Sequence, residues 1–256
     1  MAFRSRNFAL IVILAITPWS RACFAQSSSL PDAPDPATQP QGKVTVASTP
    51  RNILKDQAAI WTSPARIRES NALVPALLVI ATAVTITTDH QVMSSSKLQN
   101  TSLNDKAVTA SNGLLGGFVA APVILYGMGR IHHDDHATET GILGGESMVD
   151  ALAVDEVMKL ISRRERPEID NARGRFFQTT DSSFPSTHTM IAWSSASALA
   201  SEYGGPLTKL TAYGLATGVS ITRVLGRQHF PSDVLVGSAV GWMIGRYVVH
   251  RHHHLD

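Results

Sequence analysis

Apolar residues recur along most of the chain in blocks that short polar stretches separate. From about Ile53 their spacing becomes helical, and the stretch ILKDQAAIWTSPARI predicts a short amphipathic helix that ends near Pro64. Alanine, leucine, valine and glycine dominate the later blocks, where the alternation typical of strands is poor. These blocks cover residues 72–88, 113–129, 141–162, 189–203, 207–225 and 233–249. The pattern predicts an all-α fold, a helical bundle of about six core helices.

The length of the blocks bears on whether they cross a membrane. Four of the six blocks cover roughly 15–17 residues, whereas a transmembrane helix needs about 20. Segment 141–162 also carries four acidic residues, Glu146, Asp150, Asp155 and Glu156. Such charges are costly in lipid unless they face the interior of a bundle. We expect a bundle outside the inner membrane that can rest on the membrane surface. The alternative is a polytopic protein, with 72–88 and 113–129 as the best candidate spans.

The first residues have a different pattern. Two arginines precede an apolar run over residues 8–16, and no acidic residue occurs before Asp32. Small residues occupy positions 23 and 25, the two positions that a signal peptidase reads. This is typical of a secretory signal peptide over residues 1–25, with an uncleaved anchor helix as the alternative. We therefore expect an exported protein of the periplasm or cell envelope, which can associate with the inner membrane.

Cleavage of this segment would change the charge of the chain. The full sequence has 22 basic and 20 acidic residues, a net charge of +2 and a pI of about 8.8. The segment carries three arginines and no acid, so its loss leaves 19 basic against 20 acidic residues. A nucleic-acid partner is therefore not indicated. The sole cysteine, Cys23, leaves with the segment, which excludes disulfides, thiol catalysis and cysteine metal sites from the mature chain.

The next segment has the composition of a tether. Residues 26–52 contain five prolines with serine, glutamine and threonine between them. Such a composition is typical of a flexible, disordered linker. The expected organisation is a signal peptide at 1–25, a linker at 26–52 and a helical domain at 53–256.

A cluster of basic residues ends segment 141–162. In KLISRRERP, Lys159, Arg163 and Arg166 are spaced i, i+4 and i+7, and on a continuous helix they would share one face. Pro167 would end or bend that helix, and cations are favoured at a helix C-terminus in any case. Taken alone, the cluster fits a solvated helix end as well as an anion site.

A helix start follows in the stretch FPSTHTM. Ser186 is a plausible N-cap for a helix that begins near Thr187. The unpaired N–H groups and the positive end of the dipole make a helix start an anion-binding site. His188 lies in the first turn, within reach of a bound anion. An ordinary capped helix with an incidental histidine is the simpler alternative.

A second histidine lies in TRVLGRQHFPSD. Arg223 ends an apolar helix, Gly226 allows a turn and Pro231 opens the next helix. His229 and Asp233 are four residues apart across that helix start. A carboxylate there could accept one imidazole N–H and leave the other nitrogen nucleophilic. A loop histidine beside a capping aspartate is the alternative.

Together, the three stretches offer cations, backbone donors and two imidazoles, which phosphoryl transfer through a covalent intermediate requires.

In order, internal spacing and helical surroundings, these stretches resemble the signature motifs of the phosphatidic acid phosphatase type 2 and vanadium haloperoxidase superfamily. The motifs are Lys159-x6-Arg166-Pro167, Pro185-Ser186-Thr187-His188 and Arg223-x5-His229-x3-Asp233. They span residues 159–233, and the helical pattern over about 70–249 is compatible with the family fold.

The resemblance implies catalytic roles for three residues. His229 would attack phosphorus and form a phosphohistidine, and Asp233 would orient and polarise it. His188 would protonate the leaving alkoxide and later help to activate water. The resemblance implies no metal and no cofactor.

The resemblance also implies a phosphate cradle. Lys159, Arg166 and Arg223 would hold the phosphate oxygens and stabilise the charge of the transition state. Ser186 and the backbone N–H groups of Thr187 and its successor would complete the cradle. Thr187 stands where glycine is usual in the family, so its bulk would narrow the pocket.

The implied function is a phosphatase that hydrolyses phosphate monoesters. The substrate would be a lipid phosphate, such as phosphatidate or an isoprenyl diphosphate, or a soluble ester. The partners would be this substrate and the membrane surface. One alternative is a vanadate-dependent haloperoxidase, with His229 as the vanadate ligand. Another is a non-catalytic phosphate-binding envelope protein, which would have no need of a His229–Asp233 pair.

Two other groups carry candidate chemistry. The stretch HHDDH, His132 to His136, has metal-ligand residue types, but its polarity predicts a solvated loop. The histidine-rich tail from His250 is expected to be a surface tail in the same way. Glu146 and Asp150 lie one turn apart in an apolar helix, and this spacing raises the hypothesis that they are buried partners of the arginines.

Overall fold

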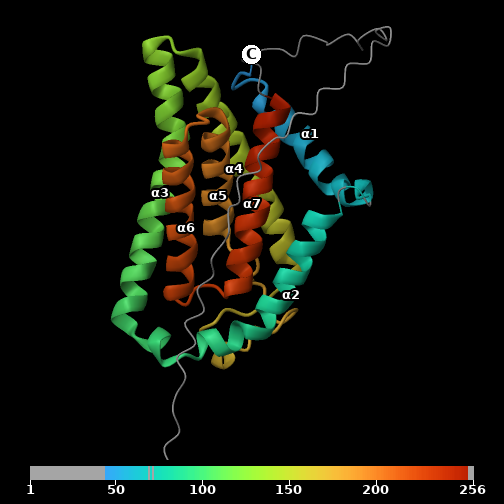
Figure 1. Ribbon diagram of the computed structural model, residues 1–256, viewed down its shortest axis with the longest axis vertical. Helices are drawn as coiled ribbons and strands as arrows, with labels where there is room; N and C mark the ends of the chain where they lie inside the picture. The colour runs from blue at the N-terminus through green and yellow to red at the C-terminus, as the bar shows by residue number, and fades with distance from the viewer. Residues whose placement is uncertain (1–43, 69, 71, 253–256) are drawn as a thin grey trace, which may run out of the picture. The chain divides into compact units, whose positions relative to one another are not determined.

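The computed structural model describes residues 44–68, 70 and 72–252, and this part of the chain is helical without a strand. The α-helices are α1 (Thr49–Thr62), α2 (Leu73–Met93), α3 (Thr101–His132), α4 (Asp135–Ser162), α5 (Thr187–Glu202), α6 (Pro206–Leu225) and α7 (Pro231–His252) (Figure 1). Short 3₁₀ helices occur at η1 (Ser63–Arg66), η2 (Ser96–Gln99) and η3 (Asp170–Ala172). The predicted all-α fold is confirmed.

The N-terminal boundary of the helical domain differs from the prediction. The expected signal peptide and residues 26–43 of the expected linker lie outside the described residues. Helix α1 begins at Thr49, inside the range expected to be linker, and Pro50 lies in its first turn. Proline is compatible with this position because the N–H that it lacks would have no helical partner there. The helix ends at Thr62, close to the expected end near Pro64.

The polar stretch between α3 and α4 is shorter than predicted. Asp134 caps α4 by accepting a hydrogen bond from the Ala137 N–H at 3.0 Å. Only His133 and Asp134 therefore lie between the two helices, and His133 has the left-handed φ of 57°. The loop predicted over His132 to His136 is wrong in extent, because its ends continue the flanking helices. Among the described residues, no group of three or more His, Cys, Asp or Glu side chains is placed to hold a metal ion.

Helix α5 lies at the centre of the packing. It contacts α3, α4, α6 and α7, and Figure 1 shows it between α6 and α7. A run of glycines at four-residue spacing, Gly237, Gly241 and Gly245, faces it from α7. A Cβ atom on Gly241 would lie 2.3 Å from the carbonyl oxygen of Met190, and one on Gly245 would lie 2.1 Å from that of Ser194. The absence of side chains therefore lets the backbones of α5 and α7 touch, which fixes their N-terminal ends side by side.

Helices α2 and α3 are long and apolar enough to cross a membrane, and both are largely exposed. Only 6% of the most apolar window of α2 is buried, and 17% of that of α3. A core helix of a soluble protein would be mostly covered, and an exposed apolar surface of this length marks an interaction with lipid or protein. The exposure favours association with a membrane and weighs against the expected bundle outside it.

Candidate active site

The three motif stretches meet at one end of the bundle, where α4 and α6 end and α5 and α7 begin. The backbone N–H of Ser186 donates to the carbonyl of Asp233 at 3.2 Å. The Lys159 ammonium donates to the hydroxyl of Thr187. Residues that are up to 74 positions apart in the sequence, from Lys159 to Asp233, therefore border the same space.

His229 is buried in this space, with 2% of its surface exposed. Its Nδ1 lies 2.7 Å from the carbonyl oxygen of Ser183. A carbonyl can only accept a hydrogen bond, so Nδ1 carries the proton and donates to it. Burial lowers the pKa of the imidazole, which keeps the ring neutral. The Nε2 atom of the neutral ring is then unprotonated, with a lone pair for attack.

Asp233 holds a different place from the one that the family resemblance implied. Its Oδ2 lies 3.7 Å from His229 Nδ1, beyond hydrogen-bond distance. The carboxylate instead accepts from the Phe230 N–H at 2.9 Å and from Arg164 Nη1 at 2.6 Å. The Ser183 carbonyl therefore takes the orienting hydrogen bond, and Asp233 acts on His229 through its negative charge.

Arg164 is the centre of a buried network behind His229. One side of its guanidinium donates to Asp233 and Ser232, and the other donates to Asp89 Oδ2 at 2.7 Å. The group lies over the ring of Phe230, 4.1 Å from the centroid. A buried ion pair is stable only when its remaining donors and acceptors are paired, which these contacts achieve. Asp89 lies near the end of α2, so the network connects an exposed apolar helix to the base of the site.

The basic stretch after α4 does not form the predicted helical face. Helix α4 ends at Ser162, and Arg163 has the left-handed φ of 46°. Arg163 therefore turns away from Lys159, and its Nε donates to the Thr179 carbonyl at 3.1 Å. The prediction that Pro167 ends this helix is wrong, because the chain leaves the helix at the left-handed residue before the proline is reached.

The cations of the site are each held by an acceptor. Lys159 Nζ lies 3.0 Å from Asp155 Oδ2. Arg166 makes a two-point contact with Asp181, at 3.1 and 3.0 Å. These contacts fix the side chains in place, so little conformational entropy remains to be lost when an anion binds.

Arg223 is the most buried of the three expected cradle cations, with 5% of its surface exposed. Its Nη1 donates to Ser111 Oγ on α3 at 3.3 Å. Its buried Nε has no hydrogen-bond partner among the described residues. Burial, and then the charge of Arg166, lowers the pKa of the guanidinium to about 10. A buried cation with an unpaired donor is a strong site for an anion.

His188 lies within reach of these charges. Its Nε2 is 2.9 Å from the side-chain oxygen of Asn112 on α3. Burial, and then Arg223 and the other basic groups of the site, lowers the pKa of the ring to about 4. His188 follows Thr187, which contacts Lys159, and Asn112 follows Ser111, which contacts Arg223. The second imidazole therefore lies at the same end of the bundle as the first.

The start of α5 offers backbone donors to this space. Ser186 occupies the N-cap position as predicted, but its side chain does not cap the helix. Its hydroxyl accepts instead from Thr189 Oγ1 at 2.8 Å. The Thr187 hydroxyl donates to Asp155 Oδ2 at 2.7 Å, so this side chain turns toward α4. The first N–H groups of a helix without a side-chain cap remain available to an anion.

Glu146 and Asp150 do not pair with the arginines of the site, so that hypothesis is wrong. Asn52 donates to Glu146 at 3.2 Å, and Gln57 donates to Asp150 at 2.8 Å, both from α1. Asp150 precedes Lys159 by nine residues, which is about 13 Å along a helix. The two acids therefore lie too far from the end of α4 to reach the site.

A comparison with known families agrees with this geometry. Residues 141–255 match the model of the PAP2 superfamily, a range that contains all three motifs. The chain is similar to the PAP2 superfamily over this range, which is a little under half of its 256 residues. The match begins within α4, so the α3 residues that contact the site, Ser111 and Asn112, lie outside it.

Curated relatives match this chain over short ranges. It is 38% identical over 69 residues to a lipid A 1-phosphatase of Porphyromonas gingivalis, covering 26% of this chain and 16% of that protein. It is 29% identical over 107 residues to a decaprenylphosphoryl-5-phosphoribose phosphatase of Mycobacterium tuberculosis, covering 42% of this chain and 58% of that protein. The chain thus spans less than two thirds of the length of either relative.

A solved structure resembles the whole fold. It is the crystal structure of a transmembrane PAP2 type phosphatidylglycerolphosphate phosphatase from Bacillus subtilis, with a TM-score of 0.50 and 21% sequence identity. The superposition covers 80% of this chain and 94% of that one. At this identity the likeness concerns the fold, and it extends to the helices that precede the matched motifs.

Several contacts of the candidate site have no signal in the three motifs. Asp155 lies four residues before Lys159, a spacing that predicts an ion pair on a helix and could have revealed it. Arg164 lies inside the first motif stretch, but the i, i+4, i+7 pattern passes over it. Asp89 and Asn112 come from helices far away in the sequence, and only the tertiary structure brings them to the site.

Proposed function

We propose that this protein is a phosphatase that hydrolyses the phosphate monoester of a lipid through a phosphohistidine at His229. The observation that carries the proposal is the state of this imidazole. Its Nδ1 proton is held by the Ser183 carbonyl at 2.7 Å, so Nε2 presents a lone pair. A site that only bound phosphate would need donors at this position, whereas an unprotonated nitrogen repels an anion until it forms a bond to phosphorus.

The first chemical step would transfer the phosphoryl group to His229. Nε2 attacks phosphorus, the bond from phosphorus to the ester oxygen breaks, and the bonding electrons leave with that oxygen. The negative charge of the bound substrate raises the pKa of His188, and the protonated ring supplies the proton that turns the leaving alkoxide into an alcohol. In the second step His188 takes a proton from water, the water oxygen attacks phosphorus, and the bond from phosphorus to Nε2 breaks. Inorganic phosphate leaves, and both imidazoles return to their first state.

The cations would stabilise the charge on the three equatorial oxygens of the transition state. Arg223 offers an unpaired buried Nε, and Lys159 and Arg166 border the same space. The start of α5 adds backbone N–H donors. Because acceptors in the protein already hold these side chains, the positive charge is arranged before the substrate binds, which is the main source of electrostatic catalysis.

Two observations support a lipid as the substrate. The two curated relatives are named for lipid A and for a decaprenylphosphoryl compound. The exposed apolar surfaces of α2 and α3 support association with a membrane, which would bring a lipid within reach of the site. A soluble ester would need neither surface.

The pattern of residues 1–25 adds the proposal that the protein is exported and acts in the cell envelope.

Phosphate release from a lipid phosphate in mixed detergent micelles tests this function. The purified chain should release phosphate from phosphatidate, and His229→Ala should reduce the rate by at least about 10³-fold, since no other group can form the covalent intermediate. Wild-type release should be inhibited by vanadate. A His229→Ala variant with near-normal hydrolysis would contradict the proposal.

The same protein also tests the haloperoxidase alternative. Halide oxidation that requires both vanadate and peroxide would establish that activity, with His229 as the vanadate ligand. A phosphatase would show phosphate release without either addition. The absence of both activities, with retained phosphate binding, would favour the non-catalytic alternative.

A further inference from the structure

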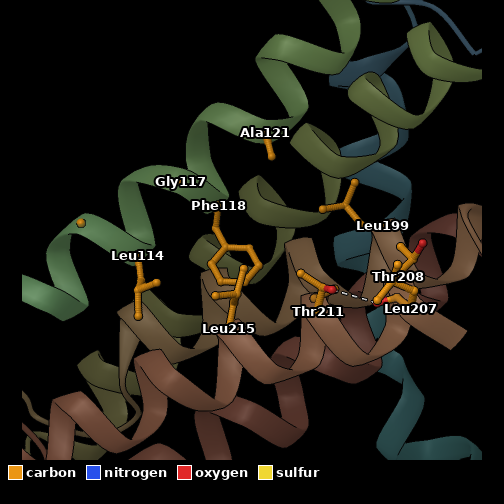
Figure 2. A pocket seen from close by; sticks show the side chains of 11 residues that line it. Leu114, Gly117, Phe118, Ala121, Leu199, Leu207, Thr208, Thr211 and Leu215 are labelled. Atoms are coloured by element: carbon orange, nitrogen blue, oxygen red, sulfur yellow. Dashed lines mark hydrogen bonds between the residues drawn. The ribbon is translucent and has the colours of Figure 1, made fainter.

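An apolar groove lies between α3 and α6 that none of the catalytic roles uses. Its volume is about 530 Å³. Leu114 and Phe118 line it from α3, Leu207 and Leu215 line it from α6, and Leu199 of α5 closes its floor. Figure 2 shows Phe118 reaching across toward Leu215. The groove extends along α3 from residue 113 to residue 121, which is about 12 Å of helix.

The groove presents hydrocarbon on almost every side. Its polar side chains are two threonines of α6, Thr208 and Thr211. The hydroxyl of Thr211 donates back to the Leu207 carbonyl at 2.9 Å, the bond drawn in Figure 2, so this residue has no need of a polar partner in the groove. Such a surface is unfavourable in contact with water and matches an aliphatic chain.

Two glycines make the space on the α3 side. A Cβ atom on Gly113 or Gly117 would meet no atom within 4 Å. The hollow therefore exists because these positions lack side chains, and the backbone packing does not require glycine there. Leu207 and Leu215 lie beside it with 73% and 46% of their surfaces exposed, so the groove opens to the outside of the bundle.

The groove ends close to the phosphate cradle. Leu114 lies three residues, or about 5 Å along the helix, after Ser111. Ser111 accepts a hydrogen bond from the cradle cation Arg223. At this end Leu114 reaches α6, since a Cβ on Gly218 would lie 3.4 Å from its side chain. An amphiphile with its phosphate beside Arg223 would need only a short linker before its hydrocarbon reached the groove.

We propose that this groove binds a hydrocarbon chain of the lipid phosphate substrate while the phosphate lies at His229. The inference rests on the proposed function and extends it, because it assigns substrate recognition to α3 and α6. The groove runs along α3 from the residues that follow Ser111, so its near end is close to the headgroup position and its far end matches the tail.

The place of the groove favours an aliphatic chain over a protein helix as the occupant. Leu114 at one end follows Ser111, the partner of the cradle cation Arg223, where the phosphate of the same lipid would bind. An extended aliphatic chain is thinner than a helix and follows a narrow channel without leaving buried peptide groups unpaired.

The test variant fills the groove from one glycine of α3, and a control variant adds the same side chain to another face of the helix. Gly117→Leu would place a side chain in the groove. Gly116→Leu is the matched control, because its Cβ would also meet no atom within 4 Å and it is not a lining residue. Successive helical positions point about 100° apart. Both changes raise helix propensity equally, so a difference between them reports on the groove.

The measured quantity is kcat/KM for dioleoyl phosphatidate divided by kcat/KM for dihexanoyl phosphatidate, in micelles of one non-ionic detergent. Gly117→Leu should lower this ratio by about 15-fold, since displacing two methylene groups costs a factor of about four for each. Gly116→Leu should leave it as in the wild type. p-Nitrophenyl phosphate, which has no chain, serves as the reference for a folded site in each variant.

Each outcome bears on one proposal. If the wild type releases no phosphate from any of the three esters, the proposed function fails before the groove is tested. If all are hydrolysed and Gly117→Leu lowers the ratio no more than Gly116→Leu does, the groove does not bind the chain. If Gly117→Leu changes the oligomeric state in detergent and the ratio stays constant, the groove is a contact between copies and the inference is overturned.

Discussion

At the scale of single residues, the site depends on which atom holds each proton. His229 Nδ1 donates its proton in a hydrogen bond to the backbone carbonyl of Ser183 at 2.7 Å. Asp233 Oδ2 lies 3.7 Å from Nδ1, and the Asp233 carboxylate accepts a hydrogen bond from Arg164. A carbonyl fixes the tautomer without being able to take the proton, so the reactive nitrogen is the same at any pH where the ring is neutral. Arg164 in turn neutralises Asp233, which leaves the imidazole less basic than a direct carboxylate contact would.

A bound anion should change the protonation of His188. In the free protein, burial and neighbouring cations hold the pKa of this ring at about 4. Phosphate brings negative charge beside the ring, and an opposite charge at short range raises a histidine pKa by about 1 to 3. Histidine NMR titration with and without inorganic phosphate should show this rise.

Protonation of His188 and the binding of phosphate must each strengthen the other. The bound state holds the proton more tightly, so the affinity of the protein for phosphate should increase as pH falls from 7 toward 4, apart from the protonation of phosphate itself. His188→Asn should lose this part of the pH dependence. An unchanged titration of His188 with phosphate present would show that the anion binds elsewhere.

At the scale of elements, the close contact of α5 and α7 positions the motifs. Helix α5 begins at Thr187, with Ser186 as its N-cap and His188 in its first turn, and α7 begins two residues after His229. The glycines at 237, 241 and 245 bring these helices together, so their starts remain fixed relative to each other. The site is built on helix ends that the core holds, and loops contribute mainly Ser183 and the basic residues after α4.

A side chain in this contact should destabilise the bundle. Gly241→Ala would put a Cβ 2.3 Å from the Met190 carbonyl oxygen, so the helices must separate. We expect a loss of roughly 2 kcal/mol or more in the free energy of unfolding, together with reduced activity. Gly214→Ala on α6 is the control, because its Cβ would meet nothing within 4 Å. Thermal unfolding in detergent measures both, and an equal effect of the two changes would contradict the packing role.

The helices and the motif positions were predictable from the sequence because both depend on local pattern. Helix α6 begins and ends within one residue of the expected block 207–225, bounded by a proline and a glycine. The left-handed turn at Arg163 was not predictable, since nothing in its neighbourhood marks a helix end before Pro167. Asn112 and Asp89 carry no local signal either, because their partners lie on other helices.

At the scale of the whole chain, the apolar faces of α2 and α3 predict insertion into a membrane. Val79, in the exposed part of α2, has 68% of its surface uncovered. A lysine at the centre of a transmembrane helix costs about 2.5–3.5 kcal/mol on insertion scales. Val79→Lys should therefore reduce the amount of protein that stays with membranes after alkaline extraction. Gln91→Lys, at the end of the same helix, should have little effect.

An equal loss for the two lysine variants would mean that α2 lies outside the bilayer. Full release of the wild-type chain by alkaline extraction would support the bundle resting on a membrane, as the length of the apolar runs predicted. This distinction bears on the substrate, since an embedded α3 would open the groove between α3 and α6 directly to lipid.

The most direct test of the account is to trap the covalent intermediate on His229. The enzyme is mixed with phosphatidate labelled in its phosphate and quenched with base within one turnover, since phosphohistidine survives base and is lost in acid. The account predicts label on the peptide that contains His229 and none on that peptide in His229→Ala. Rapid phosphate release with no labelled peptide at any quench time, or label on another residue, would contradict it.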